Sequence, residues 1–227
     1  MASLVMKNNI NETTNNLEKL QISDIIKYKN GNIKYKGEFV DGKANGKGIS
    51  YYESGKKWYE GEWINNKYEG NGKLTYSDGS KYVGMFKNCI REGEGTMTYS
   101  DGSKYVGMFK NDKWEGKGKL YYENCNLEYE GEWKNGSREG KGIEYTIKSK
   151  DKGIKWEGEW KNDRPYTGKG YHHYYDDVKF SGEWKNGLPT NGEGYLKYAD
   201  GDEFRGEIKD GTKFNGKRSE ERRVGKE

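Results

Sequence analysis

The sequence predicts an all-β protein, built as a single antiparallel sheet of tandem β-hairpins, from two observations. First, the pentapeptide YVGMF occupies residues 82–86 and again 105–109. Looser aromatic-x-Gly-x-aromatic copies recur about every 24 residues, a period typical of repeat arrays. Second, aromatic residues and glycines alternate with other residues as on a strand, and glycine inside every copy disfavours a helix. The central glycines are Gly37, Gly61, Gly84, Gly107, Gly131, Gly158, Gly182 and Gly206.

Each copy predicts two strands with tight connections. After Tyr82, a short loop over residues 87–92 reverses the chain, and Met97 and Tyr99 on the second strand share the face of Tyr82. Asp101 and Gly102 then predict a two-residue hairpin turn with positive φ, so all strand pairs are expected to be antiparallel. Aromatic rings crossing the glycine gaps would form the core. The residues expected to be most buried are Tyr59, Trp63, Tyr82, Phe86, Tyr105, Phe109, Tyr129, Trp133, Trp156, Trp160 and Trp184.

Three ranges divide the chain. Residues 1–27 are expected to be a flexible segment with a capping helix, or alternatively a partner-docking helix, lined by the apolar residues named below. Residues 28–216 form the array, and residues 217–227 are expected to be a disordered tail that could be foreign sequence. Within the array, Tyr145 follows Gly142 one residue early and the next turn is long, which predicts a bulge or bend. The apolar residues of the first segment are Leu17, Leu20, Ile22, Ile25 and Ile26.

Composition restricts the function classes. Apolar residues are 30% and charged residues 34%. A chain with so few apolar residues can still fold as a repeat array, because each repeat buries only a thin strip against its neighbours. The net charge of +4 is too small to predict a nucleic-acid partner. Two cysteines make no disulfide framework, and no signal-peptide pattern is visible. We therefore expect a cytoplasmic protein, with peripheral attachment to membrane or cytoskeleton as a further expectation.

The repeating unit resembles the MORN (membrane occupation and recognition nexus) repeat. Residues 59–63 (YEGEW), residues 129–136 (YEGEWKNG) and residues 93–102 (GEGTMTYSDG) carry the resemblance, which extends over roughly residues 28–216. The resemblance implies an elongated, twisted sheet of hairpins. It also implies scaffolding at membranes or cytoskeleton, often with self-association. Some relatives join such arrays to a kinase or methyltransferase domain, for which this chain has no residues left over.

Residues able to carry chemistry are few and scattered. His172 and His173 are adjacent, so on a strand they point to opposite faces. Cys89 and Cys125 are expected at opposite edges of the sheet, beyond disulfide reach. The Gly-x-Gly pairs precede no helix that could bind phosphate. The sequence therefore predicts no catalytic residue, no cofactor and no metal, and hence a protein that is not an enzyme.

Two surfaces stand out as candidate sites. The outward face bears Glu on first strands and Lys on second strands, which cross-strand pairing explains as a soluble, nearly neutral surface. Two units break this rule and predict an exposed apolar patch for a partner or for self-association. The alternatives are an accident of unit duplication and cover by the N-terminal segment. The patch residues are Val83, Met85, Val106 and Met108.

The second candidate surface is a basic edge formed by the loops, diluted by acidic residues. It could bind anionic lipid such as phosphoinositide, since each cation near such a surface contributes about 1 kcal/mol. Its residues are Lys87, Arg91, Lys110, Lys113, Lys134, Arg138, Lys161 and Arg164.

Three functions follow, in order of preference. The first is a non-enzymatic protein-interaction scaffold with a protein partner. The second is a peripheral anionic-lipid-binding module. The third is the repeat region of a larger kinase or methyltransferase.

Overall fold

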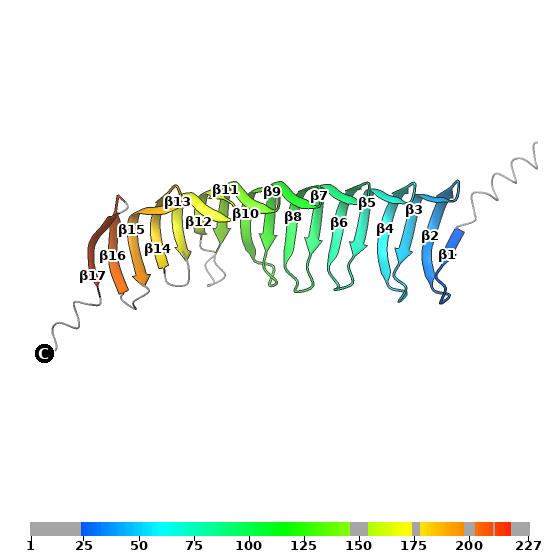
Figure 1. The fold of residues 1–227 in the computed structure, drawn as a ribbon, viewed down its shortest axis with the longest axis horizontal. Helices are drawn as coiled ribbons and strands as arrows, with labels where there is room; N and C mark the ends of the chain where they lie inside the picture. The colour runs from blue at the N-terminus through cyan, green and yellow to red at the C-terminus, as the bar shows by residue number, and fades with distance from the viewer. Residues whose placement is uncertain (1–23, 146–153, 174–177, 198–202, 211, 219–227) are drawn as a thin grey trace, which may run out of the picture. The chain divides into compact units, whose positions relative to one another are not determined.

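The computed structural model describes residues 24–145, 154–173, 178–197, 203–210 and 212–218, and these residues form strands and no helix (Figure 1). The chain divides into two compact units, Met1–Gly93 and Glu94–Glu227, and the boundary falls within β7 (Ile90–Thr98). Each unit is described by itself below.

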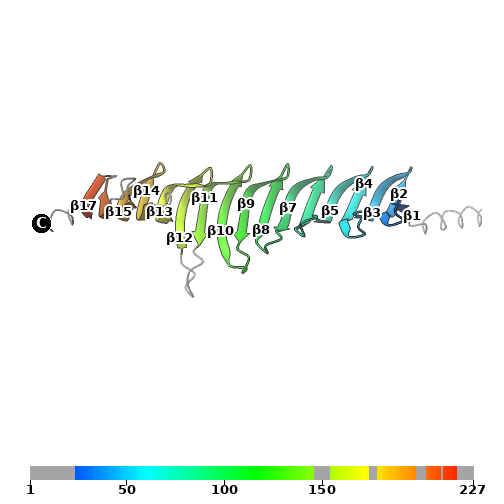
Figure 2. The same cartoon turned by 60° about the horizontal axis from the view of Figure 1, so that its bottom comes forward.

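The first unit is a meander in which each strand pairs antiparallel with the next, from β1 to β6. Figure 2 shows the consecutive hairpins, with tighter turns along one edge and longer loops along the other. The strands are β1 (Asp24–Lys27), β2 (Ile33–Val40), β3 (Lys43–Tyr51), β4 (Lys57–Ile64), β5 (Lys67–Thr75) and β6 (Lys81–Lys87).

The second unit repeats this arrangement from β8 to β17, again with each strand antiparallel to its neighbours in the chain. The predicted fold class, an all-β antiparallel array of tandem hairpins, is therefore confirmed. The strands are β8 (Lys104–Lys110), β9 (Lys113–Tyr121), β10 (Leu127–Lys134), β11 (Ser137–Tyr145), β12 (Ile154–Lys161), β13 (Arg164–His173), β14 (Val178–Lys185), β15 (Leu188–Lys197), β16 (Glu203–Lys209) and β17 (Thr212–Arg218).

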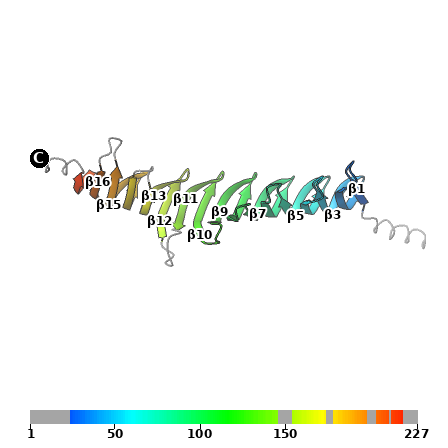
Figure 3. The same cartoon turned by 90° about the horizontal axis from the view of Figure 1, so that it is seen from below.

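The strands extend slightly beyond the range predicted for the array. Ile25 and Ile26, which the sequence placed on a candidate helix, lie instead in β1, where Ile26 pairs with Tyr35 of β2. Figure 3 shows β1 as a short strand at the blue end of the array. β-Branched residues favour a strand, and β2 offers an edge for pairing. The other apolar residues of that candidate helix lie outside the described residues. At the other end, β17 reaches Arg218.

The structure places the two-residue turns at the edge of the sheet where the sequence predicted the longer loops. Positive φ at two successive residues occurs in the loops predicted to be six residues long, as at Asn88 and Cys89, because asparagine tolerates this conformation well. Asp-Gly sequences occur in both kinds of turn. Asp41 and Gly42 form a two-residue turn with φ of 50° and 70°, whereas Asp78 and Gly79 belong to a three-residue loop. There Asp78 keeps an ordinary φ, Gly79 has φ +93°, and the Gly79 N–H donates to the Tyr76 carbonyl at 3.1 Å.

In each unit the core lies on one face of the sheet, which we call the aromatic face. Every residue that the sequence predicted to be most buried is buried. The first tyrosine of a hairpin lies along its own strand, so that its hydroxyl donates to the carbonyl three residues on. Tyr105 donates in this way to Met108 at 3.1 Å, and Tyr129 to Glu132 at 3.2 Å. The ring crosses the central glycine, and a Cβ at Gly107 would lie 2.6 Å from the Tyr105 hydroxyl. Glycine is therefore required there.

A second position on this face covers the tyrosine ring, and we call it the stacking position. It is the second residue of the returning strand in β3, β5, β9 and β11, where it pairs with the last aromatic residue of the strand before. Tyr68 stacks on Tyr59 with centroids 4.0 Å apart. Elsewhere the occupant is a guanidinium, as Arg138 lies 5.5 Å from the centre of the Tyr129 ring. The occupants are Ala44, Tyr68, Arg91, Trp114 and Arg138.

A register shift lies between Glu144 and Tyr145 in the β11–β12 pair, but the β3–β4 pair has the same shift between Ser50 and Tyr51, so it does not test the irregularity predicted after Gly142. The long turn after Tyr145 lies outside the described residues. Tyr145 pairs with Ile154, as Tyr121 pairs with Leu127 one repeat earlier. The Tyr145 hydroxyl donates to Glu130 at 2.6 Å. This contact places the Tyr145 hydroxyl on the face opposite the aromatic core, which is the face treated next.

Candidate binding groove on the charged face

A row of glycines forms the floor of a groove on the charged face of the second unit. Gly118, Gly131, Gly142 and Gly158 pair in register across β9, β10, β11 and β12. Their missing side chains would point to the aromatic face, where a Cβ at Gly142 would collide with the Tyr129 hydroxyl. On the charged face only backbone lies along this row, while the residues before and after each glycine project outward.

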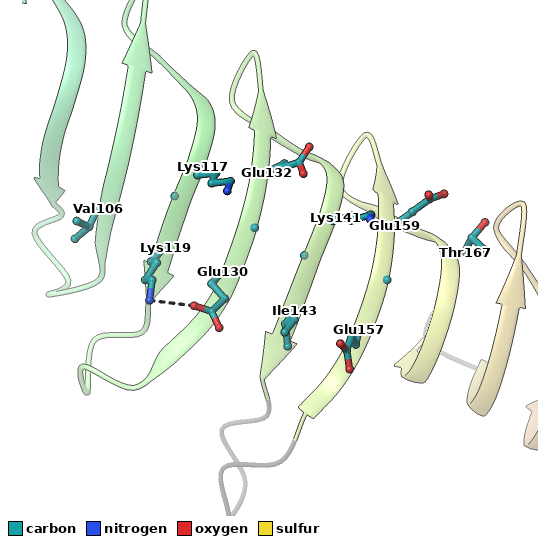
Figure 4. Close-up of a pocket in the computed structure, with 14 residues that line it drawn as sticks. Val106, Lys117, Lys119, Glu130, Glu132, Lys141, Ile143, Glu157, Glu159 and Thr167 are labelled. Atoms are coloured by element: carbon teal, nitrogen blue, oxygen red, sulfur yellow. Dashed lines mark ion pairs between the residues drawn. The ribbon is translucent and has the colours of Figure 1, made fainter.

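These flanking residues form two walls, and Figure 4 shows them on either side of the row. In the first wall, Lys119, Glu130, Ile143 and Glu157 are successive cross-strand neighbours. In the second wall, Lys117 is opposite Glu132, and Lys141 is opposite Glu159. Positive and negative side chains therefore alternate from strand to strand along the second wall, whereas in the first wall the neutral Ile143 stands between Glu130 and Glu157.

The walls and floor enclose a groove of about 820 Å³. Val106 of β8 and Thr167 of β13 come from the first and last strands that line it. A volume of this size is in the range of sites that bind a drug-sized ligand or a short peptide segment. We call it the charged groove.

Lys119 and Glu130 form the ion pair of the first wall, with Nζ and Oε2 3.0 Å apart. Hydrogen bonds from the Tyr145 hydroxyl and from Lys119 lower the pKa of Glu130 below its ordinary value. Burial, followed by the bond to Glu130, raises the pKa of Tyr145 to about 12. This corner of the groove is thus held in one charged arrangement at neutral pH.

Other charges in the groove have no such partner. Among the described residues, neither Lys117 nor Lys141 has a carboxylate within ion-pair distance, although each has one opposite it in register. Both lysines are exposed, as are Glu157 and Glu159. The groove therefore presents charges of both signs that a ligand could pair.

Comparison with family models decides the family. The MORN repeat model matches seven segments, which together cover more than half of the chain. The chain belongs to the MORN repeat family. The matched segments are residues 35–57, 59–81, 82–104, 105–124, 129–146, 156–165 and 180–203. A search of curated proteins finds no match.

The predicted apolar patch falls on exposed positions of the MORN array. Val83 and Met85 in the first unit are 52% and 47% exposed, and Val106 and Met108 in the second unit are 36% and 38% exposed. Val106 also lines the charged groove. Their exposure agrees with the sequence analysis, and their role as a contact surface remains a prediction.

The predicted basic edge is less uniform than the sequence suggests. Its lysines and Arg164 are exposed. Arg91 lies 5.7 Å from the centre of the Tyr82 ring, and Arg138 lies 4.4 Å from that of Trp160, so both occupy the aromatic face. Arg138 also approaches Glu144 and Asp163, each at 3.6 Å. These two guanidiniums support the core and do not extend from the loops.

The scattered polar candidates form no site in the part of the chain that the structure describes. Cys89 and Cys125 are free and exposed, and no group of three or more His, Cys, Asp or Glu residues could hold a metal ion. The side chains of His172 and His173 lie outside the description. No described segment forms a helix able to cross a membrane.

Sequence reasoning missed the charged groove, because it treated the Glu and Lys residues of this face only as a soluble surface. The signal was present, since several glycines of the row are flanked on both sides by long charged side chains, as in Glu130-Gly131-Glu132 and Lys117-Gly118-Lys119. Flanking side chains with nothing between them leave a depression once the glycines align in register.

Proposed function

We propose that this MORN repeat chain is a non-enzymatic protein-interaction scaffold and that the charged groove binds an extended segment of a partner protein. The observation that carries the proposal is the aligned glycine floor between two walls that bear charges of both signs. A partner backbone can approach the glycine row closely, because no side chain rises from it on this face, while the partner's charged side chains pair with both walls.

The chemistry of the partner follows from the unpaired groups. Lys117 and Lys141 offer two cations, and Glu157 and Glu159 offer two carboxylates. The complementary partner segment carries both acidic and basic side chains. Its affinity falls with salt, because these charges are exposed and therefore screened.

Charge reversal within the second unit tests the proposal. The variant Lys117→Glu/Lys141→Glu removes the unpaired cations of the groove. The matched control, Lys110→Glu/Lys134→Glu, makes the same charge change at exposed positions of the predicted basic edge. Each protein is used to recover partners from native cells. The partner recovered by the parent is then purified and titrated against all three proteins.

We expect the groove variant to bind that partner at least tenfold more weakly and the control to bind it as the parent does. Equal binding by the groove variant and the parent would exclude the groove as the site. Sedimentation with vesicles containing anionic lipid addresses the alternative. Pelleting that the control variant loses and the groove variant keeps would favour membrane binding through the basic edge over the scaffold proposal.

A further inference from the structure

The first unit has a cavity on its aromatic face, separate from the charged groove. Its volume is about 590 Å³. Tyr35, Trp58, Trp63 and Tyr68 contribute aromatic surface, while Ala44 and Ser50 contribute small side chains.

Two small residues in register create this cavity. Ala44 occupies the stacking position, where β5 has Tyr68 and β9 has Trp114. Ser50 pairs with Tyr35, whereas the equivalent tyrosines Tyr59 and Tyr105 pair with Leu74 and Leu120. The first hairpin thus lacks both a large ring and a leucine side chain where other hairpins have them.

The other hairpins show which groups fit beside the tyrosine. Tyr68 lies parallel to Tyr59 with an interplanar angle of 15°, and Trp114 lies parallel to Tyr105 at 8°. A guanidinium also fits, but Arg138 has carboxylates beside it. Among the described residues that line the cavity none is acidic, and Lys34 is a cation. The vacant position therefore favours a neutral aromatic ring over a guanidinium.

Ser50 adds a polar requirement. Its side chain is 5% exposed, and its Oγ has no hydrogen-bond partner although the residue lines the cavity. A buried hydroxyl without a partner is unfavourable, and a ligand that supplies a hydrogen bond removes that penalty. An indole N–H or a phenol O–H has the required combination of a flat apolar body and a polar edge.

We propose that this cavity binds a tryptophan or tyrosine side chain of a partner protein, stacked on Tyr35 and hydrogen-bonded to Ser50 Oγ. Residues 1–23, which precede β1 beside the cavity, contain no Phe, Tyr or Trp. Residues 1–23 therefore cannot supply the ring, and the proposal assigns it to another protein.

Titration of the full chain with indole and with p-cresol, the side chains of tryptophan and tyrosine, tests the cavity. We expect saturable binding of both probes. Ala44→Tyr fills the stacking position as Tyr68 does and lowers the affinity at least tenfold, whereas the control Lys43→Tyr, on an exposed neighbour, leaves it unchanged. Ser50→Ala weakens binding about fivefold through the lost hydrogen bond. Undiminished binding in a folded Ala44→Tyr protein would overturn the proposal.

Further variants keep the test decisive. Should Ala44→Tyr fail to fold, Ser50→Leu fills the other half of the cavity with the residue found at Leu74 and is expected to abolish binding of both probes. Binding of indole only after Leu17→Ser/Leu20→Ser/Ile22→Ser would show that the chain's own segment occupies the cavity. Either that result or no binding in any variant would overturn the proposal.

The source of the ring is tested with a protein partner. A partner recovered by the parent must be displaced by indole and must be lost with Ala44→Tyr. It must also be lost when one tryptophan or tyrosine of the partner is replaced by alanine. Indole binding without any partner that meets these conditions would assign the cavity to a free aromatic molecule and would overturn the protein assignment.

Discussion

The guanidinium carbon of Arg138 lies 4.4 Å from the centre of the Trp160 ring, in the position that a stacked ring occupies in other hairpins. On its other side it approaches Glu144, which is 6% exposed and accepts a 2.9 Å bond from Lys155. Glu144 occupies the position that Leu74 and Leu120 occupy in two other hairpins. One hairpin has thus replaced a ring and a leucine by an ion cluster.

We predict that Arg138→Ala destabilises the second unit by about 3 kcal/mol, because it removes a ring contact and leaves Glu144 with one cation. Arg138→Tyr/Glu144→Leu, which copies Tyr68 and Leu74, should restore stability to at least the parent value, since apolar groups of similar volume often replace buried ion pairs without loss. Urea unfolding followed by tryptophan fluorescence measures both changes. A double variant less stable than Arg138→Ala would contradict the equivalence of the two arrangements.

Glu128 and Glu130 on β10 are predicted to have opposite effects on stability. Burial raises the pKa of Glu128, partly offset by Arg138, whereas hydrogen bonds from Tyr145 and Lys119 lower that of Glu130. Ionised Glu128 therefore destabilises the fold once the pH rises above its ordinary pKa of 4.5. Ionised Glu130 stabilises it above that pH, and this contribution is lost as the pH falls through its lowered folded-state pKa.

At pH 7, Glu128→Gln should raise the melting temperature and Glu130→Gln should lower it. The Glu128 difference should disappear as the pH falls from its raised folded-state pKa to the ordinary value of 4.5, whereas the Glu130 difference should shrink only below 4.5, as the pH falls through its lowered folded-state pKa. Thermal unfolding from pH 3 to pH 7 measures them. Differences that stay constant over this range would show that ionisation is not the cause.

Gly107→Val is predicted to destabilise the second unit by about 3 kcal/mol, because overfilling a packed core forces its neighbours to move. A Cβ there would lie 2.6 Å from both the Tyr105 hydroxyl and the Gly118 Cα, and the second of these contacts is backbone. Gly136→Ala is a control, since nothing lies within 4 Å of a Cβ at that turn, although its φ of +91° adds some strain. Equal melting temperatures for Gly107→Val and the parent would refute the role assigned to the glycine row.

The sequence predicted the strands, their pairing and the buried residues because period-two alternation and the glycine period report directly on one buried face. Turn type was less accessible. The pairs Asp78-Gly79 and Asp101-Gly102 attracted the prediction of positive φ at two residues, whereas Asn65-Asn66 and Asp41-Gly42 adopt it at the opposite edge. The position of Arg138 could not be predicted without the turn type. A two-residue turn pairs Arg138 with Trp133, and this pairing places Arg138 on the aromatic face.

The charged groove was not predictable from charge alone. The charges at alternating positions of the sequence add up to a nearly neutral face. The depth of the groove depends instead on which residues align across neighbouring strands. Gly131 aligns with Gly118 and Gly142, so a residue that admits a tyrosine ring on one face also lowers the floor on the other. Likewise, the cavity beside Ala44 follows from comparing register-equivalent positions, which requires the strand pairing.

The last prediction concerns the apolar residues on the charged face. In the first unit, Val83→Glu/Met85→Glu restores the charges that β4 carries at Glu60 and Glu62. Folding should be preserved to within about 0.5 kcal/mol, because both positions are exposed. Met85 also lies against Gly93 as Glu62 lies against Gly70, so a carboxylate fits there.

The control is Val40→Glu/Ile64→Glu, which changes two exposed apolar residues of the same unit, 57% and 52% exposed, outside the predicted patch. Val106→Glu/Met108→Glu makes the corresponding change in the second unit and is measured separately. If these residues form a contact surface, at least one patch variant should lose self-association by light scattering or lose a recovered partner, while the control keeps both. Patch variants that match the parent in mass and in partners would show instead that the repeated valine and methionine are a copied substitution without a binding role.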